Sequence, residues 1–302
     1  MTEIVPNGFM TIQKHIVFGS PRSGTTFLMR VLNALPTTEC VNGIIFSPVV
    51  PQILNQPLSQ EVYDALLIDF ERSLELYLES GFFHARAAAL KKWYSAGKPL
   101  RGLLPALRGE RSADAMIFKE PFLSFSPELP FFALPEARLI HIYRDGRDCA
   151  DSLVRSYDVL SDDRLIDLKS TEMRFGRKNG DRYVPWWVEQ EHDEAFLAAS
   201  PFGRAIWMWK EMVGRCEAFL SKPEVVASGR VMLLRYEDLM RDPLHYGEAV
   251  VNHLGLTMTP PYKKSLLQGH TRSIGIHKSR PQSEQEEAIR IAKNELQRYG
   301  YL

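Results

Sequence analysis

The chain has 302 residues, 45% of them hydrophobic, enough to build one large domain or two small ones around a buried core. Its 37 Lys and Arg residues balance its 37 Asp and Glu residues, so no bulk field favours nucleic acid or an anionic membrane, and any anion binding must be local. Three cysteines at no metal-ligand spacing indicate a reducing compartment and buried packing. The polar N-terminus lacks a secretory signal, and no apolar run approaches the roughly 20 residues of a membrane span. We therefore expect a soluble, cytoplasmic protein.

Strand signals alternate with helical patterns along the chain. Apolar runs at residues 15–18, 115–118, 138–143 and 231–234 predict short strands buried on both faces, and a weaker run at 38–41 predicts one more. Each run is followed by loop residues and then by a helical pattern. This alternation predicts an α/β fold with a central parallel sheet of about five strands and helices on both faces.

Three longer segments have the periodicity of amphipathic helices. They are residues 61–79, 203–220 and 283–299, and the apolar stripe of the first is typical of core packing. The chain has no internal repeat, low-complexity tract or clean interdomain linker. We therefore expect residues 1–302 to form a single domain.

The segment at about 158–200 is charged and irregular. A long insertion in a compact domain is usually a lid or a binding region, so we expect a lid or an acceptor-binding element here. Its aromatic side chains, with one just beyond it, could stack on a ligand or anchor the insertion to the body of the protein, and we favour anchoring for most of them. These side chains are Tyr183, Trp186, Trp187 and Phe202.

A tight Pro/Ser/Gly loop at residues 19–26 joins the first predicted strand to a helical pattern. In a strand–loop–helix arrangement of this kind, the loop amides and the helix N-terminus point at a phosphate. Gly19 and Gly24 have the spacing of the ATPase and GTPase loop, but Thr25 stands where that loop has its lysine, and the basic residue is Arg22. The loop predicts a P-loop-like phosphate site that does not serve ordinary ATP chemistry.

A second candidate phosphate site follows the strand at 138–143. Arg144 lies at the carboxyl end of this strand, and Ser152 lies in the next helix. Ligands of open α/β sheets bind outside the carboxyl ends of the strands, so Arg144 should face the same crevice as the first loop and give charge-assisted contacts to a phosphate. The alternative is an arginine paired with Asp148 or Asp151 on the surface. Two phosphate sites at adjacent strand ends predict a nucleotide with both 5′ and 3′ phosphates.

Three segments in this order resemble the motifs of sulfotransferases, the enzymes that use 3′-phosphoadenosine 5′-phosphosulfate (PAPS). Pro21-Arg-Ser-Gly-Thr-Thr-Phe27 resembles the 5′-phosphosulfate loop, and Tyr143-Arg-Asp-Gly-Arg-Asp-Cys-Ala-Asp-Ser152 resembles the 3′-phosphate motif. Arg235-Tyr-Glu-Asp-Leu239 is similar to the segment whose tyrosine lies by the adenine. The similarity runs from about residue 15 to the C-terminus and is weakest between 42 and 111. The chain is closer to the bacterial and carbohydrate-type branch than to the soluble animal enzymes, and the resemblance implies a P-loop-like three-layer fold.

The resemblance also implies roles for the matching residues. Arg22 neutralises the charge that grows on the phosphate side as the sulfuryl group departs. Arg144 and Ser152 hold the 3′-phosphate, and Tyr236 contacts the purine, unless it is simply a packed tyrosine. No metal is needed, because fixed cations and amides meet the leaving group. The residues implied at the 5′-phosphate are Ser23, Gly24, Thr25, Thr26 and Phe27.

Transfer to a hydroxyl also needs a base that accepts the proton of the acceptor. Met116-Ile-Phe-Lys-Glu-Pro-Phe122 follows a predicted strand and resembles the Lys-x-Pro loop of many sulfotransferases. We expect Glu120 to be the base and Lys119 to contact the transferring group or orient the base. The alternative is a Lys–Glu pair that braces the turn before Pro121.

The chain departs from the soluble animal enzymes, which have a histidine in this segment and a lysine in the first loop. Other candidates for the base are therefore kept open: Glu39, which we expect after the second strand, and His84. His141 lies mid-strand and is expected to be a core histidine with satisfied hydrogen bonds.

The segment before the last helix is a further candidate for nucleotide binding. The Arg-Lys-Gly loop with which soluble members close over the 3′-phosphate is absent, but His270-Thr-Arg-Ser-Ile-Gly-Ile-His-Lys278 occupies the place of a comparable loop of bacterial members. Arg272, His277 and Lys278 are candidate donors to the nucleotide; the alternative is that they are solvated loop charges.

The resemblance implies in-line transfer of a sulfuryl group from PAPS to a hydroxyl of a small-molecule, sugar or lipid acceptor, with adenosine 3′,5′-bisphosphate as product. Two other classes stay open: an ATP-dependent P-loop phosphotransferase, against which Thr25 counts, and a non-catalytic nucleotide-binding protein. The balanced charge argues against a heavily sulfated polymer as acceptor. The sequence leaves a homo-oligomer open.

Overall fold

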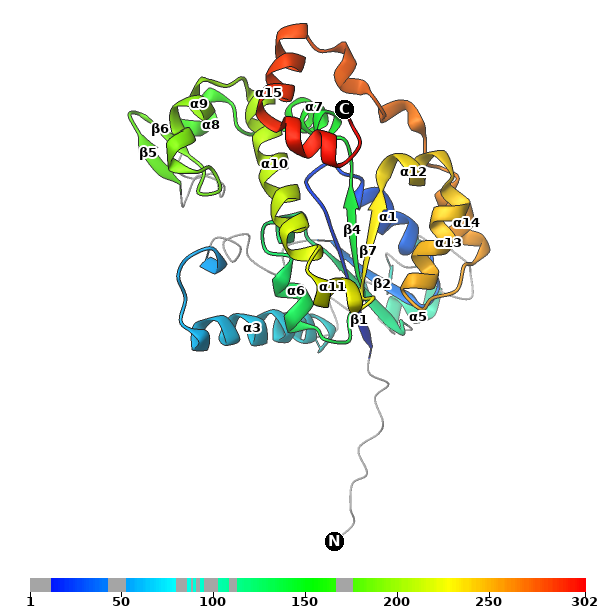
Figure 1. The fold of residues 1–302 in the computed structure, drawn as a ribbon. Coiled ribbons are helices and arrows are strands. Elements are labelled where there is room, and N and C mark those ends of the chain that lie inside the picture. Colours follow the sequence, from blue (N-terminus) through cyan, green and yellow to red (C-terminus); the bar gives the residue numbers. More distant parts are fainter. Residues whose placement is uncertain are drawn as a thin grey trace.

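Five parallel strands form the centre of the protein, in the order β2–β3–β1–β4–β7 (Figure 1). The computed structural model describes residues 12–42, 53–79, 86–87, 89–90, 93–94, 103–108, 113–166 and 176–302. The parallel α/β sheet and its five strands confirm the predicted fold, including the weakly signalled strand at 38–41. The strands are β1 (Gln13–Phe18), β2 (Thr38–Asn42), β3 (Ala115–Lys119), β4 (Leu139–Tyr143) and β7 (Val231–Arg235).

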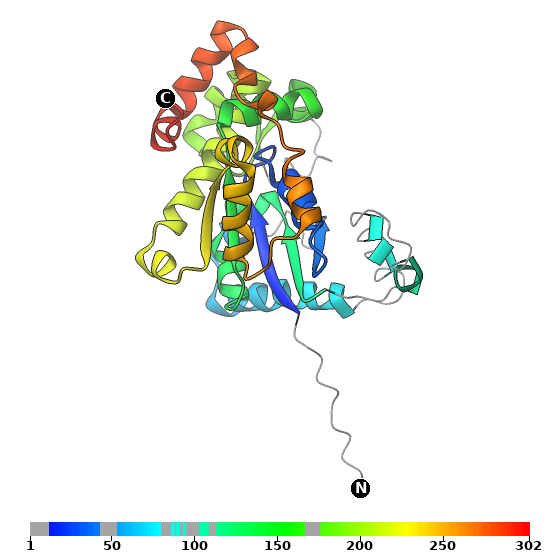
Figure 2. The same cartoon turned by 90° about the vertical axis from the view of Figure 1, so that its right-hand side faces the viewer.

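Helices cover both faces of this sheet. Alternate residues of each strand point to opposite faces, and the apolar side chains on the two faces belong to two separate buried clusters. One face packs against α1 (Thr25–Leu32), α12 (Tyr236–Arg241), α13 (Pro243–His253) and α14 (Pro260–Leu266), which Figure 2 shows side by side. The other face packs against α3 (Gln60–Glu79), α6 (Glu128–Ala133), α11 (Pro223–Ala227) and the C-terminal half of α10 (Pro201–Leu220). This is the expected three-layer arrangement.

A third apolar cluster lies beyond the sheet, around the N-terminal half of α10. It joins α7 (Gly146–Ser156) and α15 (Gln282–Arg298) to the described part of the insertion at 158–200, which forms a lobe beside α10 (Figure 1). Trp187 and Phe202 are buried in this cluster, and Tyr183 and Trp186 pack against it. The aromatic side chains therefore anchor the insertion, as we favoured. The lobe contains α8 (Asp162–Ile166), β5 (Arg177–Asn179), β6 (Arg182–Val184), the 3₁₀ turn Gln190–His192 and α9 (Asp193–Ala198).

Further short elements in the described ranges are α5 (Leu103–Arg108) and the 3₁₀ turns Pro121–Phe125, Thr271–Ser273 and Ile276–Ser279. All three cysteines are buried and free, as expected for packing residues. Within the described ranges, no helix combines the length and the apolar character needed to cross a bilayer.

Because the five strands are parallel, their carboxyl ends meet at one edge of the sheet. Pairing brings Val17 beside Lys119, Phe18 beside His141, and Tyr143 beside Arg235. The loops that follow β1, β3, β4 and β7 therefore start close together. These are the loops that carry the predicted site residues.

Candidate functional site

The loop between β1 and α1 approaches its neighbours so closely that glycine is needed at two positions. A Cβ at Gly19 would lie 2.0 Å from the carbonyl oxygen of Ile142, and one at Gly24 would lie 2.4 Å from Cδ2 of Tyr236. Gly24 also has a left-handed φ of 104° as the residue that precedes α1. The predicted phosphate loop is therefore packed directly against the ends of β4 and β7.

Side chains of this loop differ in accessibility. Ser23 is fully buried, and its Oγ has no hydrogen-bond partner, while Thr25 is also buried. Thr26 is exposed and Phe27 is half-buried. The buried hydroxyl of Ser23 is therefore a hydrogen-bond donor that lacks an acceptor.

Arg22 adopts a left-handed φ of 70°, which is unusual for a residue with a Cβ. Its Nε donates to Oγ of Ser152 on α7 at 2.9 Å, and its guanidinium lies 5.7 Å from the ring centroid of Tyr157. Two residues predicted from separate motifs, Arg22 and Ser152, are thus in direct contact.

Arg144 is buried at the end of β4 with only 4% of its surface exposed. Its Nη1 donates to the carbonyl oxygen of Arg22 at 3.1 Å, and its guanidinium lies 4.7 Å from the ring centroid of Tyr236. Its Nη2 donates to the carbonyl oxygen of Ser273 and lies 3.6 Å from Oδ2 of Asp148, while its Nε has no partner. The ion pair with Asp148 does form, but it is buried rather than on the surface.

Tyr236 begins α12 directly after β7 and is also buried. Its ring packs against Gly24 on one side and against Arg144 on another, and its hydroxyl is 2.8 Å from Oγ of Ser273. The structure thus brings together the first loop, the arginine–serine pair and the tyrosine segment, as their positions at neighbouring strand ends predict.

The segment between α14 and α15 covers this site. Its Ser273 contacts both Arg144 and Tyr236, and Asp148 accepts hydrogen bonds from the backbone amides of Gly275 and His277. Arg272 and Lys278 are exposed on the same segment. Sequence reasoning found the two exposed cations and named Asp148 as a possible partner of Arg144. It missed the contacts of Ser273, because a backbone carbonyl gives no sequence signal.

Lys119 and Glu120 lie at the carboxyl end of β3. Glu120 is 8% exposed, and its Oε1 accepts a hydrogen bond from the amide of Phe122 at 3.1 Å, so it caps the 3₁₀ turn Pro121–Phe125. Burial raises the pKa of the Glu120 carboxyl above its usual value, although the cap and Lys119 oppose this. Burial likewise lowers the pKa of Lys119, and Glu120 opposes that shift. A partly desolvated carboxyl with a raised pKa suits a general base.

The other candidate bases fare differently. Glu39 lies inside β2 and not after it, so the expected position of this residue was wrong. In the strand it is buried, with 8% of its surface exposed. His84 lies outside the described residues. His141 is buried as expected, but neither ring nitrogen has a hydrogen-bond partner, so the expectation of satisfied hydrogen bonds was wrong. Its ring instead stacks on Phe18 at a centroid distance of 5.1 Å, and burial lowers its pKa to about 4.

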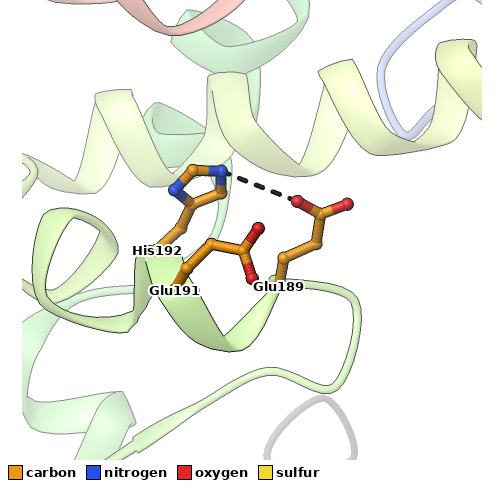
Figure 3. A group of neighbouring side chains, drawn as sticks. All are labelled: Glu189, Glu191 and His192. Carbon is orange, nitrogen blue, oxygen red and sulfur yellow. Dashed lines mark ion pairs between the residues drawn. The ribbon is translucent and has the colours of Figure 1, made fainter.

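Within the described ranges, one group of side chains has the composition of a metal site: Glu189, Glu191 and His192 (Figure 3). It lies on the surface lobe, where Nε2 of His192 is 3.6 Å from Oε2 of Glu189. Both glutamates are exposed, and acidic clusters of this kind are common on protein surfaces. The group belongs to a different part of the fold from the strand ends described above.

Comparison with known proteins identifies the family. The model of the Sulfotransferase family matches residues 16–260. A search of curated proteins finds no match. Among solved structures, a sulfotransferase domain of the Synechococcus PCC 7002 olefin synthase is 17% identical, with 95% of this chain and 96% of that chain covered and a TM-score of 0.49.

Two other solved structures are similar. Sulfotransferase STF9 from Mycobacterium avium is 15% identical, covers 96% of this chain and 78% of that chain, and has a TM-score of 0.46. A sulfotransferase from Alicyclobacillus acidocaldarius is 15% identical, covers 90% of this chain and 98% of that chain, and has a TM-score of 0.41. The match to the family model spans most of the sequence and includes all the strand ends of the site, so it is sufficient by itself to assign the family. The chain therefore belongs to the sulfotransferase family.

Proposed function

We propose that this protein is a cytoplasmic PAPS-dependent sulfotransferase that transfers a sulfuryl group to a hydroxyl of a small-molecule, sugar or lipid acceptor. The observation that carries the proposal is the contact between its two phosphate-binding motifs. Arg22 of the first loop donates to Ser152, and Arg144 donates to the carbonyl of Arg22. A nucleotide that carries phosphates at both 5′ and 3′ positions matches two cationic motifs held side by side.

The donors in the site fit the phosphates of such a substrate. Among the described residues, Oγ of Ser23 and Nε of Arg144 are buried polar atoms without a partner. A buried donor left unsatisfied is costly, so each gains from an anionic oxygen. In the proposed complex, Ser23 and the amides that start α1 hold the 5′-phosphate, together with Thr25, Thr26 and Phe27. Arg144 and Ser152 hold the 3′-phosphate, and Tyr236 contacts the purine.

PAPS supplies the sulfuryl group as a co-substrate. The residues of this chain bind it, neutralise charge and move one proton. Glu120 accepts the proton of the acceptor hydroxyl at a carboxylate oxygen as the new oxygen–sulfur bond forms and the bond to the 5′-phosphate breaks. Lys119 and Arg22 stabilise the negative charge on the transferring group and on the departing phosphate. Arg272 and Lys278 are proposed as further cations for the bound nucleotide.

We propose that the acceptor binds against aromatic side chains that follow Glu120. Phe122 lies in the 3₁₀ turn that Glu120 caps, Phe125 lies 5.1 Å from the ring of Trp186, and the Arg215 guanidinium lies 5.5 Å from that ring. Phe122 and Trp186 are half-buried. Such a wall supports an acceptor with an apolar or ring-shaped portion beside its hydroxyl.

Thermal shift with two nucleotides tests the proposal. Adenosine 3′,5′-bisphosphate, the expected product, should stabilise the protein by about 2.7 kcal/mol at 100 times its dissociation constant. Magnesium-ATP should give no comparable shift, because Thr25 stands where the ATPase loop has its lysine. A shift with magnesium-ATP alone would favour the phosphotransferase instead. Binding of the bisphosphate without transfer from PAPS to any of a panel of hydroxyl compounds would favour a non-catalytic binding protein.

A further inference from the structure

The carboxylate of Glu237 is buried between the ends of β4 and β7 and is shared by two elements. The residue is 2% exposed. Its Oε1 accepts a hydrogen bond from the backbone amide of Asp145 at 3.0 Å, and its Oε2 accepts one from the hydroxyl of Tyr301 at 3.1 Å. Nε of Arg235 lies 3.5 Å from the same Oε2. Glu237 therefore joins the connection after β4 to residues that follow α15.

Tyr301 reaches this position because the chain reverses at the end of α15. Gly300 has a left-handed φ of 71°, its amide donates to the carbonyl of Gln297 at 3.0 Å, and the amide of Tyr301 donates to the carbonyl of Leu296 at 2.7 Å. These are the two hydrogen bonds of a Schellman motif, which turns the chain back on a helix end. Figure 1 shows the end of the chain, marked C, beside α7.

Two arginines hold the reversed segment. Nη2 of Arg235 donates to the carbonyl of Gly300 at 3.2 Å, and its guanidinium lies 4.5 Å from the ring centroid of Tyr301. Nη2 of Arg147 donates to the carbonyl of Tyr301 at 2.7 Å, while the same guanidinium pairs with the Asp145 carboxylate at 2.8 Å. The hydroxyl of Tyr301 is thus placed on Glu237 by fixed contacts on both sides.

The peptide that Glu237 holds is the one between Arg144 and Asp145. Its carbonyl, that of Arg144, accepts from Nε1 of Trp209 at 3.1 Å, and its amide donates to Glu237. A Cβ at Gly146 would lie 2.2 Å from the Trp209 ring, so the indole fills the space under this turn. The direction in which Arg144 leaves the backbone is therefore fixed by Trp209 from one side and by Glu237 from the other.

We propose that Tyr301 is a positioning residue for the nucleotide, acting through Glu237 on the peptide that aims Arg144. This inference rests on the proposed function, because it concerns recognition of the 3′-phosphate by Arg144. Without the tyrosine hydroxyl, Oε2 of Glu237 keeps only Arg235, and the carboxylate is drawn away from the Asp145 amide. The buried amide then loses its partner, and the Arg144 guanidinium loses its fixed direction. The first loop, which follows β1, keeps its contact with α7, in which Nε of Arg22 donates to Oγ of Ser152.

The test compares two ligands that differ only at the 3′ position, adenosine 3′,5′-bisphosphate and adenosine 5′-monophosphate, by calorimetric titration. In Tyr301→Phe, we expect affinity for the bisphosphate to fall about threefold to tenfold, as the loss of one buried hydrogen bond implies. Affinity for the monophosphate should stay within about twofold of wild type. A general loss of structure would weaken both ligands alike, so the ratio of the two affinities distinguishes positioning from folding.

A neighbouring tyrosine supplies the matched control. Tyr299 is also packed at the end of α15, but its hydroxyl points to the carbonyl of Val213 at 3.4 Å and takes no part in the Glu237 network. Tyr299→Phe should leave the ratio unchanged. Glu237→Gln should lower the ratio, and adding Tyr301→Phe in that background should change it little further, because both act through one carboxylate.

Equal weakening of both ligands in Tyr301→Phe, or no change in the ratio, overturns the inference. Full additivity of Tyr301→Phe and Glu237→Gln overturns it as well. If wild-type protein itself does not prefer the bisphosphate, it is the proposed function that fails, which the same titrations show before any variant is made.

Discussion

The carboxyl of Glu120, which we propose as the base, also carries a cost to stability. This carboxyl is buried at the end of β3 and its pKa is raised by that burial. The pKa of Glu120 is higher in the folded than in the unfolded state. The contribution of this carboxyl to the free energy of unfolding is therefore most favourable at pH values below the ordinary glutamate pKa, and it is lost as the pH rises through the raised value of the folded state. Above that raised pKa, the folded protein carries a buried charge that it would be more stable without.

Replacing the carboxyl of Glu120 separates its proposed effect on turnover from its effect on stability. Glu120→Gln should lower turnover by about 100-fold or more if the carboxylate is the base, while nucleotide affinity stays near wild type. Its melting temperature at pH 7 should be higher than that of wild type, and the difference should disappear below about pH 4. Steady-state kinetics with bisphosphate titration and pH-dependent melting curves measure these changes. Unchanged turnover would remove Glu120 as the base.

Glu128 on α6 is a matched control for this substitution. Burial raises the pKa of its carboxyl as well, but it lies on α6 and not at the carboxyl end of a strand of the sheet. Glu128→Gln should raise the melting temperature at neutral pH in the same way and leave turnover unchanged. A loss of turnover in this variant would mean that the effect of Glu120→Gln arises from general changes in charge.

At the scale of elements, the segment between α14 and α15 is held on α7 by two carboxylates. Asp148 accepts from the amide of Gly275 at 2.7 Å and from Nδ1 of His277 at 2.6 Å, and Asp151 accepts from Nε of Arg280 at 2.7 Å. On the N-terminal side of Gly275, Ser273 sits on Arg144. The part of the segment from Gly275 onward is thus anchored to α7. The part before Gly275 occupies a donor of Arg144, the residue proposed to hold the 3′-phosphate.

This division predicts where the segment moves when nucleotide binds. A 3′-phosphate that binds Nη2 of Arg144 in addition to its free Nε displaces the carbonyl of Ser273. The hydrogen bond from the Ile274 amide to the Thr271 carbonyl, 2.9 Å long, should then open. The amides of Gly275 and His277 should stay protected by Asp148. Amide exchange resolved by NMR should therefore quicken at Ile274 with adenosine 3′,5′-bisphosphate and not with the 5′-monophosphate. Binding of the bisphosphate with unaltered exchange at Ile274 would contradict this.

The sequence predicted elements better than contacts. The three central strands appear in continuous apolar runs because both of their faces are buried, and the strand ends place Arg22, Arg144 and Tyr236 together. The expectation that the run at 231–234 is buried on both faces was wrong, because β7 is an edge strand and Leu233 is exposed. The pairing of Arg144 with a backbone carbonyl left no signal, since any residue offers that group. The unsatisfied ring of His141 was equally hidden, because a pattern of burial does not report whether a partner is present.

At the scale of the whole molecule, one arginine ties the lobe at 158–200 to the body. Arg204 on α10 is 2% exposed. Its guanidinium donates to the carbonyls of Phe196 at 3.1 Å, Leu160 at 2.9 Å and Leu197 at 2.7 Å, three groups that belong to the lobe. We propose that residues 1–302 form a single domain, so the lobe and the sheet should unfold together.

Removing this arginine should loosen that connection. Arg204→Ala removes a buried donor that three carbonyls share, although Phe196 keeps the Ala199 amide and Leu197 keeps Arg182. The free energy of unfolding should fall by about 3 kcal/mol. Arg182→Ala is the control, because Arg182 contacts the Leu197 carbonyl at 3.3 Å from a half-exposed position and should cost less than about 1 kcal/mol. Urea unfolding followed by fluorescence measures both. A wild-type curve with two transitions would contradict a single cooperative domain.

The contact between Gly24 and Tyr236 has a consequence for nucleotide binding. With no side chain at position 24, the ring at the end of β7 rests on the turn that begins α1, where a Cβ would come within 2.4 Å. Both partners are fixed to ends of the same sheet, so the Tyr236 ring and the phosphate loop cannot move independently of each other. For a nucleotide bound as proposed, the sheet therefore sets the separation between the purine and the 5′-phosphate, and a side chain at position 24 would disturb both contacts at once.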